Sequence, residues 1–114
     1  MVDTYAPDYA DIVWVVLEPR VGHEQSGRRP AIVISTKDFS FHTSLSVMCP
    51  ITSKTKGLPF EVKLYDTNTE GAVLPIYVKS LDYVARKAKF IEKAPKEIAD
   101  SAAEMVGTIL GLDY

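Results

Sequence analysis

The sequence predicts a mainly β protein, in which five to seven short strands form a small curled barrel closed by one C-terminal α-helix. Short apolar segments rich in β-branched and aromatic residues recur before residue 94, each bounded by a polar loop that contains glycine or proline. After residue 94 the apolar residues change to helical spacing. A chain of 114 residues with no repeat, low-complexity tract or linker also fits a single domain over residues 1–114.

Continuous apolar runs predict the first three strands. Residues 11–17 (DIVWVVL), 30–35 (PAIVIS) and 45–51 (LSVMCPI) each have the length and composition of a buried strand. Residues 20–29 between the first two are polar and contain two glycines, which indicates a long hairpin loop. The short mixed segment 37–42 is consistent with one helical turn.

The second half of the chain predicts shorter and less regular strands. Residues 60–64 alternate apolar and polar side chains, as a half-exposed strand does. Residues 72–78 are apolar but contain Pro75, which indicates an edge strand or a bulge. Residues 88–94 are a further candidate strand.

A helix is expected to begin after Ala94-Pro95. Its apolar face carries Ile98, Ala102, Met105, Ile109 and Leu112, and its polar face carries Glu97, Asp100 and Glu104. This helix would cover one opening of the barrel.

Charge is unevenly distributed along the chain. The net charge is −2, but residues 20–63 hold seven basic and three acidic side chains, a local excess of +4. A local positive patch on an acidic protein favours binding of a specific polyanion. A solvated surface of mixed charge is the alternative.

Composition indicates a cytoplasmic protein. No apolar run reaches the length of a membrane span, and the N-terminus lacks the basic stretch of a signal peptide. The single cysteine, Cys49, excludes an internal disulfide and lies in an apolar run, where a buried thiol is expected.

Two polar segments beside predicted strands could form a phosphate-binding site. Residues 22–30 (GHEQSGRRP) and 49–57 (CPITSKTKG) place basic and hydroxyl side chains near glycines. The two histidines, His23 and His42, have no partner at metal-ligand spacing, and neither a nucleotide-cradling motif nor a GxSxG elbow occurs. We therefore expect neither a metal nor a cofactor, and phosphodiester chemistry by side chains alone.

Arg29 and Thr52 are the main candidates for that chemistry. Arg29 precedes Pro30, which favours an extended backbone, and a guanidinium can hold two phosphate oxygens at once. The alternative for Arg29 is a surface salt bridge with Glu24 or Glu18. Thr52 follows an apolar strand and could donate its hydroxyl to a phosphate oxygen, or simply cap a turn. His23 and Glu24 are candidate general bases near neutral pH.

These residues, together with several longer motifs, resemble the MazF/PemK family of toxin endoribonucleases in the CcdB-like toxin superfamily. The matching segments are YAPD (5–8), DIVW (11–14), GHEQSGRRPA (22–31), CPITSK (49–54), KGLPFEV (56–62), VKSLD (78–82) and FIEKAP (90–95). The resemblance thus runs nearly end to end, and it implies a curled SH3-like barrel in a symmetric homodimer.

The resemblance also implies an activity and partners. Members cleave single-stranded RNA, mostly mRNA, at a short sequence without a metal, and an antitoxin with a disordered acidic tail blocks their RNA groove. The family's catalytic arginine and threonine fall on Arg29 and Thr52, and its substrate-gating loop corresponds to residues 23–28. The residues then expected to contact RNA are Gln25, Ser26, Arg28, Ser53, Lys54, Lys56, Tyr77, Lys79 and Arg86.

This sequence departs from the common family pattern at Pro75-Ile76-Tyr77, at Tyr83 to Arg86 and at Val16. The first two changes are expected near the base-reading surface, where Ile and Tyr would replace hydrogen bonds with a stacking face. Two alternatives remain at this point. One is a CcdB-like gyrase-poisoning toxin, and the other is an SH3-like binding module that has lost its RNA site.

Overall fold

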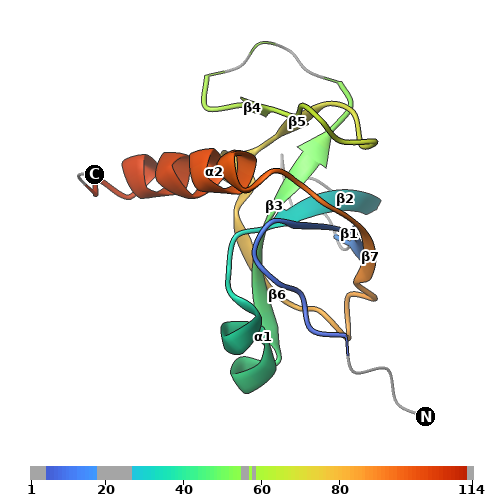
Figure 1. The fold of residues 1–114 in the computed structure, drawn as a ribbon. Coiled ribbons are helices and arrows are strands. Elements are labelled where there is room, and N and C mark those ends of the chain that lie inside the picture. The colour runs from blue at the N-terminus through green and yellow to red at the C-terminus, as the bar shows by residue number, and fades with distance from the viewer. Residues whose placement is uncertain (1–4, 18–26, 55–56, 58, 113–114) are drawn as a thin grey trace.

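The computed structural model describes residues 5–17, 27–54, 57 and 59–112 (Figure 1). In chain order the elements are β1 (Asp11–Val16), β2 (Arg28–Val33), α1 (Lys37–Thr43), β3 (Leu45–Thr52), β4 (Val62–Lys63), β5 (Ala72–Val73), the 3₁₀ helix η1 (Pro75–Tyr77), β6 (Lys79–Asp82), β7 (Lys89–Lys93) and α2 (Lys96–Ile109). The predicted class, mainly β with a C-terminal helix, is confirmed.

The strands form one antiparallel, curled sheet in the order β4-β5-β3-β2-β1-β7. The remaining strand, β6, pairs with the first half of β3, along the same edge that β5 occupies farther on. The strands at the two ends of this order, β4 and β7, are not paired with each other among the described residues. The sheet therefore curls without closing, as Figure 1 shows.

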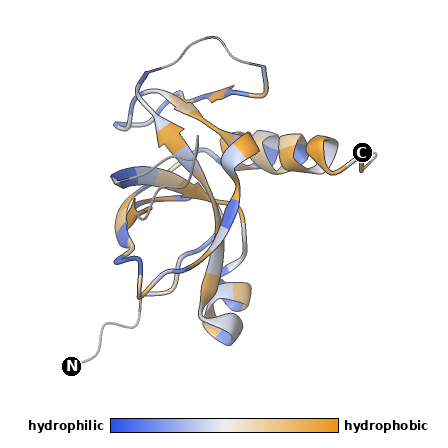
Figure 2. Cartoon of the chain, turned by 180° about the vertical axis from the view of Figure 1, so that it is seen from behind, coloured by the Kyte–Doolittle hydropathy of each residue, from blue (hydrophilic) through white to orange (hydrophobic). Residues whose placement is uncertain are grey.

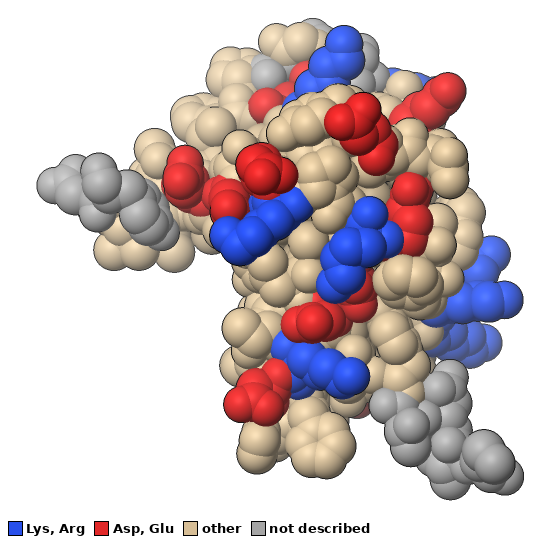
Figure 3. Space-filling view, viewed as in Figure 1, with Lys and Arg blue, Asp and Glu red and all other residues tan. Residues whose placement is uncertain are grey.

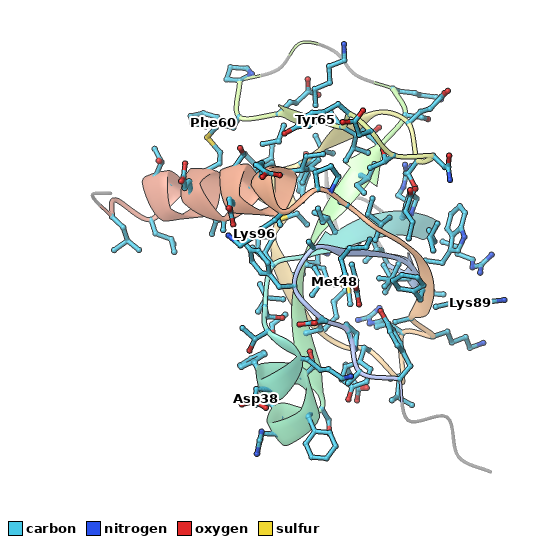
Figure 4. The ribbon with its side chains drawn as sticks, in the orientation of Figure 1. Asp38, Met48, Phe60, Tyr65, Lys89 and Lys96 are labelled. Atoms are coloured by element: carbon cyan, nitrogen blue, oxygen red, sulfur yellow. The ribbon has the colours of Figure 1, made fainter. Side chains whose placement is uncertain are left out.

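Alternation along the central strands sends side chains to two apolar clusters. Ile12, Ile32 and Ile51 face one cluster, which α2 covers with Ile98 and Ala102. The second cluster, on the other face, contains Val13, Val15, Leu17, Ala31, Val33, Met48 and Leu81. Figure 2 shows apolar and polar residues alternating along α2, and Figure 4 shows Met48 inside the curl. Each buried aliphatic side chain contributes about 1.5–3 kcal/mol to the hydrophobic driving force.

Cys49 belongs to the first cluster and is fully buried, as the sequence predicts. Burial raises the pKa of its thiol to about 12. Since the thiolate is the nucleophilic form, Cys49 has a packing role at neutral pH.

A buried carboxylate fixes the chain before β1. Asp11 is 3% exposed and accepts hydrogen bonds from the Tyr5 hydroxyl (2.7 Å) and the Asp8 N–H (2.9 Å). Its other oxygen lies 2.6 Å from the Lys93 ammonium on β7. Burial, followed by the hydrogen bond to Asp11, raises the pKa of Tyr5. This network ties the N-terminal segment to the end strand β7.

The predicted elements of the N-terminal half are confirmed, including the helical turn that becomes α1. The second half differs from prediction in three places. The strand expected over 60–64 is only β4, and the one expected over 72–78 ends at Val73, because Pro75 begins η1 and has no N–H for a sheet. Strand β6 was not predicted, since its sequence KSLD has a single buried residue. Residues 18–26 of the predicted hairpin loop lie outside the described part.

We expect Ile98→Ala to lower the free energy of unfolding by about 2–5 kcal/mol, because it leaves a cavity between α2 and the sheet. Ile98 is 1% exposed, whereas Val84 is 72% exposed, so Val84→Ala serves as the control with a change within about 0.5 kcal/mol. Urea denaturation followed by circular dichroism measures both. Equal losses in the two variants would contradict the assigned core.

Candidate functional site

Arg29 and Thr52 lie at the same end of two neighbouring strands. The register of β2 and β3 pairs Ile32 with Cys49 and Ala31 with Pro50. The pairing of β2 with β3 ends at Ala31 and Pro50, and the same register extended by two residues would set Arg29 opposite Thr52. Directly opposed residues in antiparallel strands point to the same face, with Cβ atoms about 4.5–5.5 Å apart. On this extended register a guanidinium and a hydroxyl would face each other at one end of the sheet, although 22 residues of sequence lie between them.

The Thr52 side chain is held in place. Thr52 is 8% exposed, and its Oγ1 accepts a hydrogen bond from the Lys54 N–H at 3.1 Å. The turn-capping role considered for this hydroxyl is therefore present. A hydroxyl that accepts one bond keeps its own proton to donate, so the cap fixes the oxygen without removing its donor.

Gly71 is needed for the loop 66–71 to approach Thr52 closely. It has φ of +116°, and a Cβ on it would lie 2.0 Å from the Thr52 carbonyl oxygen. Any other residue would collide with the strand backbone. The absence of a side chain at Gly71 lets the loop pass directly over the end of β3.

A hollow of about 810 Å³ opens at this end of the sheet. We call it the Trp14 hollow. Its lining includes Trp14, Arg28, Arg29, Ser53, Asn68, Thr69 and Glu70. Its volume is within the range of small-molecule sites.

Arg28 stacks on Trp14, with its guanidinium carbon 4.8 Å from the ring centre. Contacts of this kind contribute about 0.5–1 kcal/mol at exposed sites. Figure 3 shows basic side chains gathered at the edge of the molecule where β1, β2 and β7 lie, and Figure 4 places Lys89 there. A cation held on an aromatic face beside a basic edge suits binding of a phosphate chain and stacking of a base.

Residues 66–71, the loop between β4 and β5, are held by Glu92 on β7. One carboxylate oxygen accepts the Asn68 N–H at 2.9 Å, and the other accepts the Thr69 N–H at 2.8 Å and the Thr69 hydroxyl at 2.7 Å. Partial burial alone would raise the pKa of Glu92, but these hydrogen bonds outweigh it and hold that pKa below its usual range. We call this arrangement the Glu92 clamp.

A second hollow, of about 670 Å³, lies on the other side of the same loop. We call it the Tyr65 hollow, after the half-exposed ring that forms part of its wall (Figure 4). Ser53, Thr69 and Glu70 line both hollows. The loop 66–71 is therefore a ridge between them.

The remaining residues predicted to contact RNA are distributed as follows. Arg28 and Ser53 line the Trp14 hollow, and Lys54 is exposed directly beyond it in sequence. Three others lie elsewhere: Tyr77 is in η1, Lys79 is in β6 and Arg86 follows β6. None of the three is among the described residues that line the two hollows. The candidate bases His23 and Glu24, together with Gln25, Ser26 and Lys56, lie outside the described residues.

Sequence reasoning missed Trp14, the ridge and Glu92 as parts of this site. Trp14 is indistinguishable from a core residue in an apolar run, and residues 66–71 have only the composition of a turn. No local signal pairs Glu92 with a loop more than twenty positions away. Within the described part of the chain, no group of three or more His, Cys, Asp or Glu side chains could hold a metal, and no helix is long and apolar enough to cross a membrane.

Comparison with known proteins gives consistent results. A family model for the PemK-like, MazF-like toxin of type II toxin–antitoxin systems matches residues 8–110. The endoribonuclease toxin MazF of Escherichia coli K12 is 40% identical over 99 residues, which cover 86% of this chain and 89% of that protein. A crystal structure of MazF from Deinococcus radiodurans superposes with a TM-score of 0.90 at 39% identity, covering 95% of this chain and 99% of that one. A MazE–MazF complex from the same organism gives 0.84 at 36% identity, over 96% and 100%.

The Glu92 clamp predicts a pH-dependent loop. Because the folded state lowers the pKa of Glu92, its contribution to stability is present above about pH 4.3, the ordinary glutamate pKa, and is lost as pH falls through the lower folded value. We expect the amide NMR shifts of Asn68 and Thr69 to titrate together, with a midpoint below about 4.3. Glu92→Gln should abolish this titration. A midpoint at or above the ordinary value would contradict the clamp.

Proposed function

Because the chain belongs to the PemK-like, MazF-like toxin family, we propose that it is the toxin of a type II toxin–antitoxin system and acts as an endoribonuclease. The support is the match over residues 8–110, together with the identity to the endoribonuclease MazF of Escherichia coli. The observation that supports the chemistry is the β2–β3 register, which, extended by two residues, would set Arg29 opposite Thr52.

The proposed substrate is single-stranded RNA, mostly mRNA, in the cytoplasm. The Trp14 hollow combines a stacked arginine, an aromatic face and a hydroxyl, which are the groups that bind single strands. An unpaired base could stack there, whereas the base edges in the deep, narrow major groove of an A-form helix are out of reach of side chains.

In the proposed reaction the 2′-hydroxyl of the RNA attacks the adjacent phosphorus, and the bond from phosphorus to the 5′-oxygen breaks. The products are a 2′,3′-cyclic phosphate and a 5′-hydroxyl. A base takes the proton of the 2′-hydroxyl, and the leaving 5′-oxygen receives a proton from the protonated base or from water. The nucleophile belongs to the substrate, so the protein has to supply only charge stabilisation and proton transfer, without a metal.

Arg29 and Thr52 would supply the stabilisation. A guanidinium keeps its proton at neutral pH and can bind two phosphate oxygens, so Arg29 serves as the cation that opposes the extra negative charge of the pentacovalent phosphorus. The Thr52 hydroxyl, held by the Lys54 N–H, donates to a non-bridging oxygen. Glu24, His23 or water takes the first proton.

The proposed partners are a second copy of the chain and a cognate antitoxin. The similarity to a chain in the MazE–MazF complex of Deinococcus radiodurans supports such an antitoxin. An acidic, disordered tail would complement the positive excess of residues 20–63 and compete with RNA for the same end of the sheet.

We expect Arg29→Ala to lower the rate of RNA cleavage by roughly 100- to 1000-fold, because it removes a charge donor aimed at the transition state. Single-turnover cleavage of a long RNA, with sequencing of the fragment ends, measures the rate and the cut positions. Arg29→Lys is the matched variant: it keeps the charge but loses the two-pronged grip, and should be intermediate. Near-normal cleavage by a folded Arg29→Ala protein would refute the role, and a parallel incubation with gyrase and plasmid tests the gyrase-poisoning alternative.

A substrate with 2′-deoxyribose at the cut position should resist cleavage, since the proposed nucleophile is missing. The control is the same RNA with the deoxyribose two nucleotides away, which should be cut at the normal rate. Gel analysis of the fragments compares cleavage of the two substrates, and a phosphatase test detects the cyclic end. Normal cutting of the first substrate would exclude attack by the 2′-hydroxyl.

A further inference from the structure

The ridge formed by residues 66–71 is a rigid loop beside the candidate site, and the proposed chemistry does not use its side chains. Its backbone is fixed at three points. The Glu92 clamp holds Asn68 and Thr69, the Thr67 hydroxyl donates to the Thr69 carbonyl oxygen at 2.7 Å, and Gly71 lies against the Thr52 carbonyl. An exposed loop fixed in this way presents its side chains in a defined direction.

The clamp leaves two side chains of the ridge available. It uses the backbone of Asn68 and Thr69 and the hydroxyl of Thr69, and no group of Glu70. The Asn68 amide and the Glu70 carboxylate are exposed, and within the described part of the chain neither has a hydrogen-bond partner. Asn68 lines the Trp14 hollow and Glu70 lines both hollows.

The chemistry of these two groups favours bases over the phosphate backbone. A carboxylate repels a phosphate, but it accepts hydrogen bonds from the amino group of adenine, cytosine or guanine. A carboxamide can donate and accept on the edge of one base. Uracil has no exocyclic amino group, and its one edge N–H lies between two carbonyl oxygens that a carboxylate repels, so a carboxylate at this place disfavours it.

The ridge is also close to the scissile linkage. Gly71 touches Thr52, and Ser53, the residue after Thr52, lines both hollows. A base beside the phosphate held by Arg29 and Thr52 would therefore lie next to the ridge, because the loop 66–71 contacts the end of β3 at Thr52.

We propose that Asn68 and Glu70 select a base with an exocyclic amino group at one position beside the cut, and that Glu92 is the positioning residue that holds them. This inference rests on the proposed ribonuclease function. Both oxygens of Glu92 are already occupied by the loop, so Glu92 acts through Asn68 and Glu70 and does not contact RNA.

The test is the base profile of cleavage. Wild type, Asn68→Ala, Glu70→Ala and Glu92→Ala are each incubated with an RNA pool randomised around the cut, and the fragment ends are sequenced. In wild type one position should disfavour uracil. Glu70→Ala and Asn68→Ala should reduce that discrimination by about tenfold, which is what loss of one good base contact gives. Glu92→Ala should cause the same shift at the same position, with a larger change in KM than in kcat.

Glu97→Ala is the control, since it removes an exposed carboxylate on α2, away from both hollows, and should leave the profile unchanged. Glu92→Gln keeps the shape of the side chain and one acceptor, and should partly rescue the selection. If Glu92→Ala does not fold, the two exposed ridge variants still decide the question.

An unchanged profile in Asn68→Ala and Glu70→Ala, in a wild-type background that cleaves RNA, would overturn base selection alone. A wild-type protein that cuts no RNA would overturn the proposed function, and base selection with it. The two failures are therefore distinguishable.

Discussion

One carboxylate joins the two ends of the sheet. In the order β4-β5-β3-β2-β1-β7, Glu92 lies on the strand at one end, and the loop 66–71 connects the two strands at the other end. The three hydrogen bonds from that loop to Glu92 bring the ends together where strand pairing does not. Charge-assisted bonds of this kind are shorter and stronger than neutral ones. The shape of both hollows depends on them, because the loop they fix forms a wall of each.

Pro50 lies where strand β3 changes its partner along one edge of the sheet. Strand β3 pairs with β6 up to Met48 and with β5 from Ile51, and Pro50 lies between the two partners. Its carbonyl oxygen accepts the Leu74 N–H at 2.8 Å, but proline has no N–H to return. The ladder along this edge is therefore interrupted, and the last two residues of β3 continue with a different strand. Thr52 is delivered in this way to the end of the sheet where the ridge lies.

The sequence was sufficient for elements that depend on local pattern and insufficient for contacts between distant segments. Continuous apolar runs predict buried strands such as β1 and β3, and the helical spacing of apolar residues predicts α2. The strands β4, β5 and β6 are short or polar, and they form because they pair with other strands. A local stretch of sequence does not reveal those partners. The same holds for the site: Arg29 and Thr52 were identified by residue type and resemblance, whereas the Glu92 clamp exists only once β7 has met the loop 66–71.

The hydrogen bonds that hold the ridge leave the side chains at two of its positions free to vary. Two of the three clamp bonds use backbone N–H groups, which every residue except proline supplies, and the third uses the Thr69 hydroxyl. Positions 68 and 70 therefore contribute no side chain to the stability of the loop, and their chemistry can change while its position stays fixed. The groups proposed to be catalytic have no such freedom, because in the proposed reaction Arg29 and Thr52 must keep both their type and their place. In the proposed function, the fold thus separates a fixed reaction centre from an adjustable ridge, and the sequence that is cut can change while the ability to cut is kept.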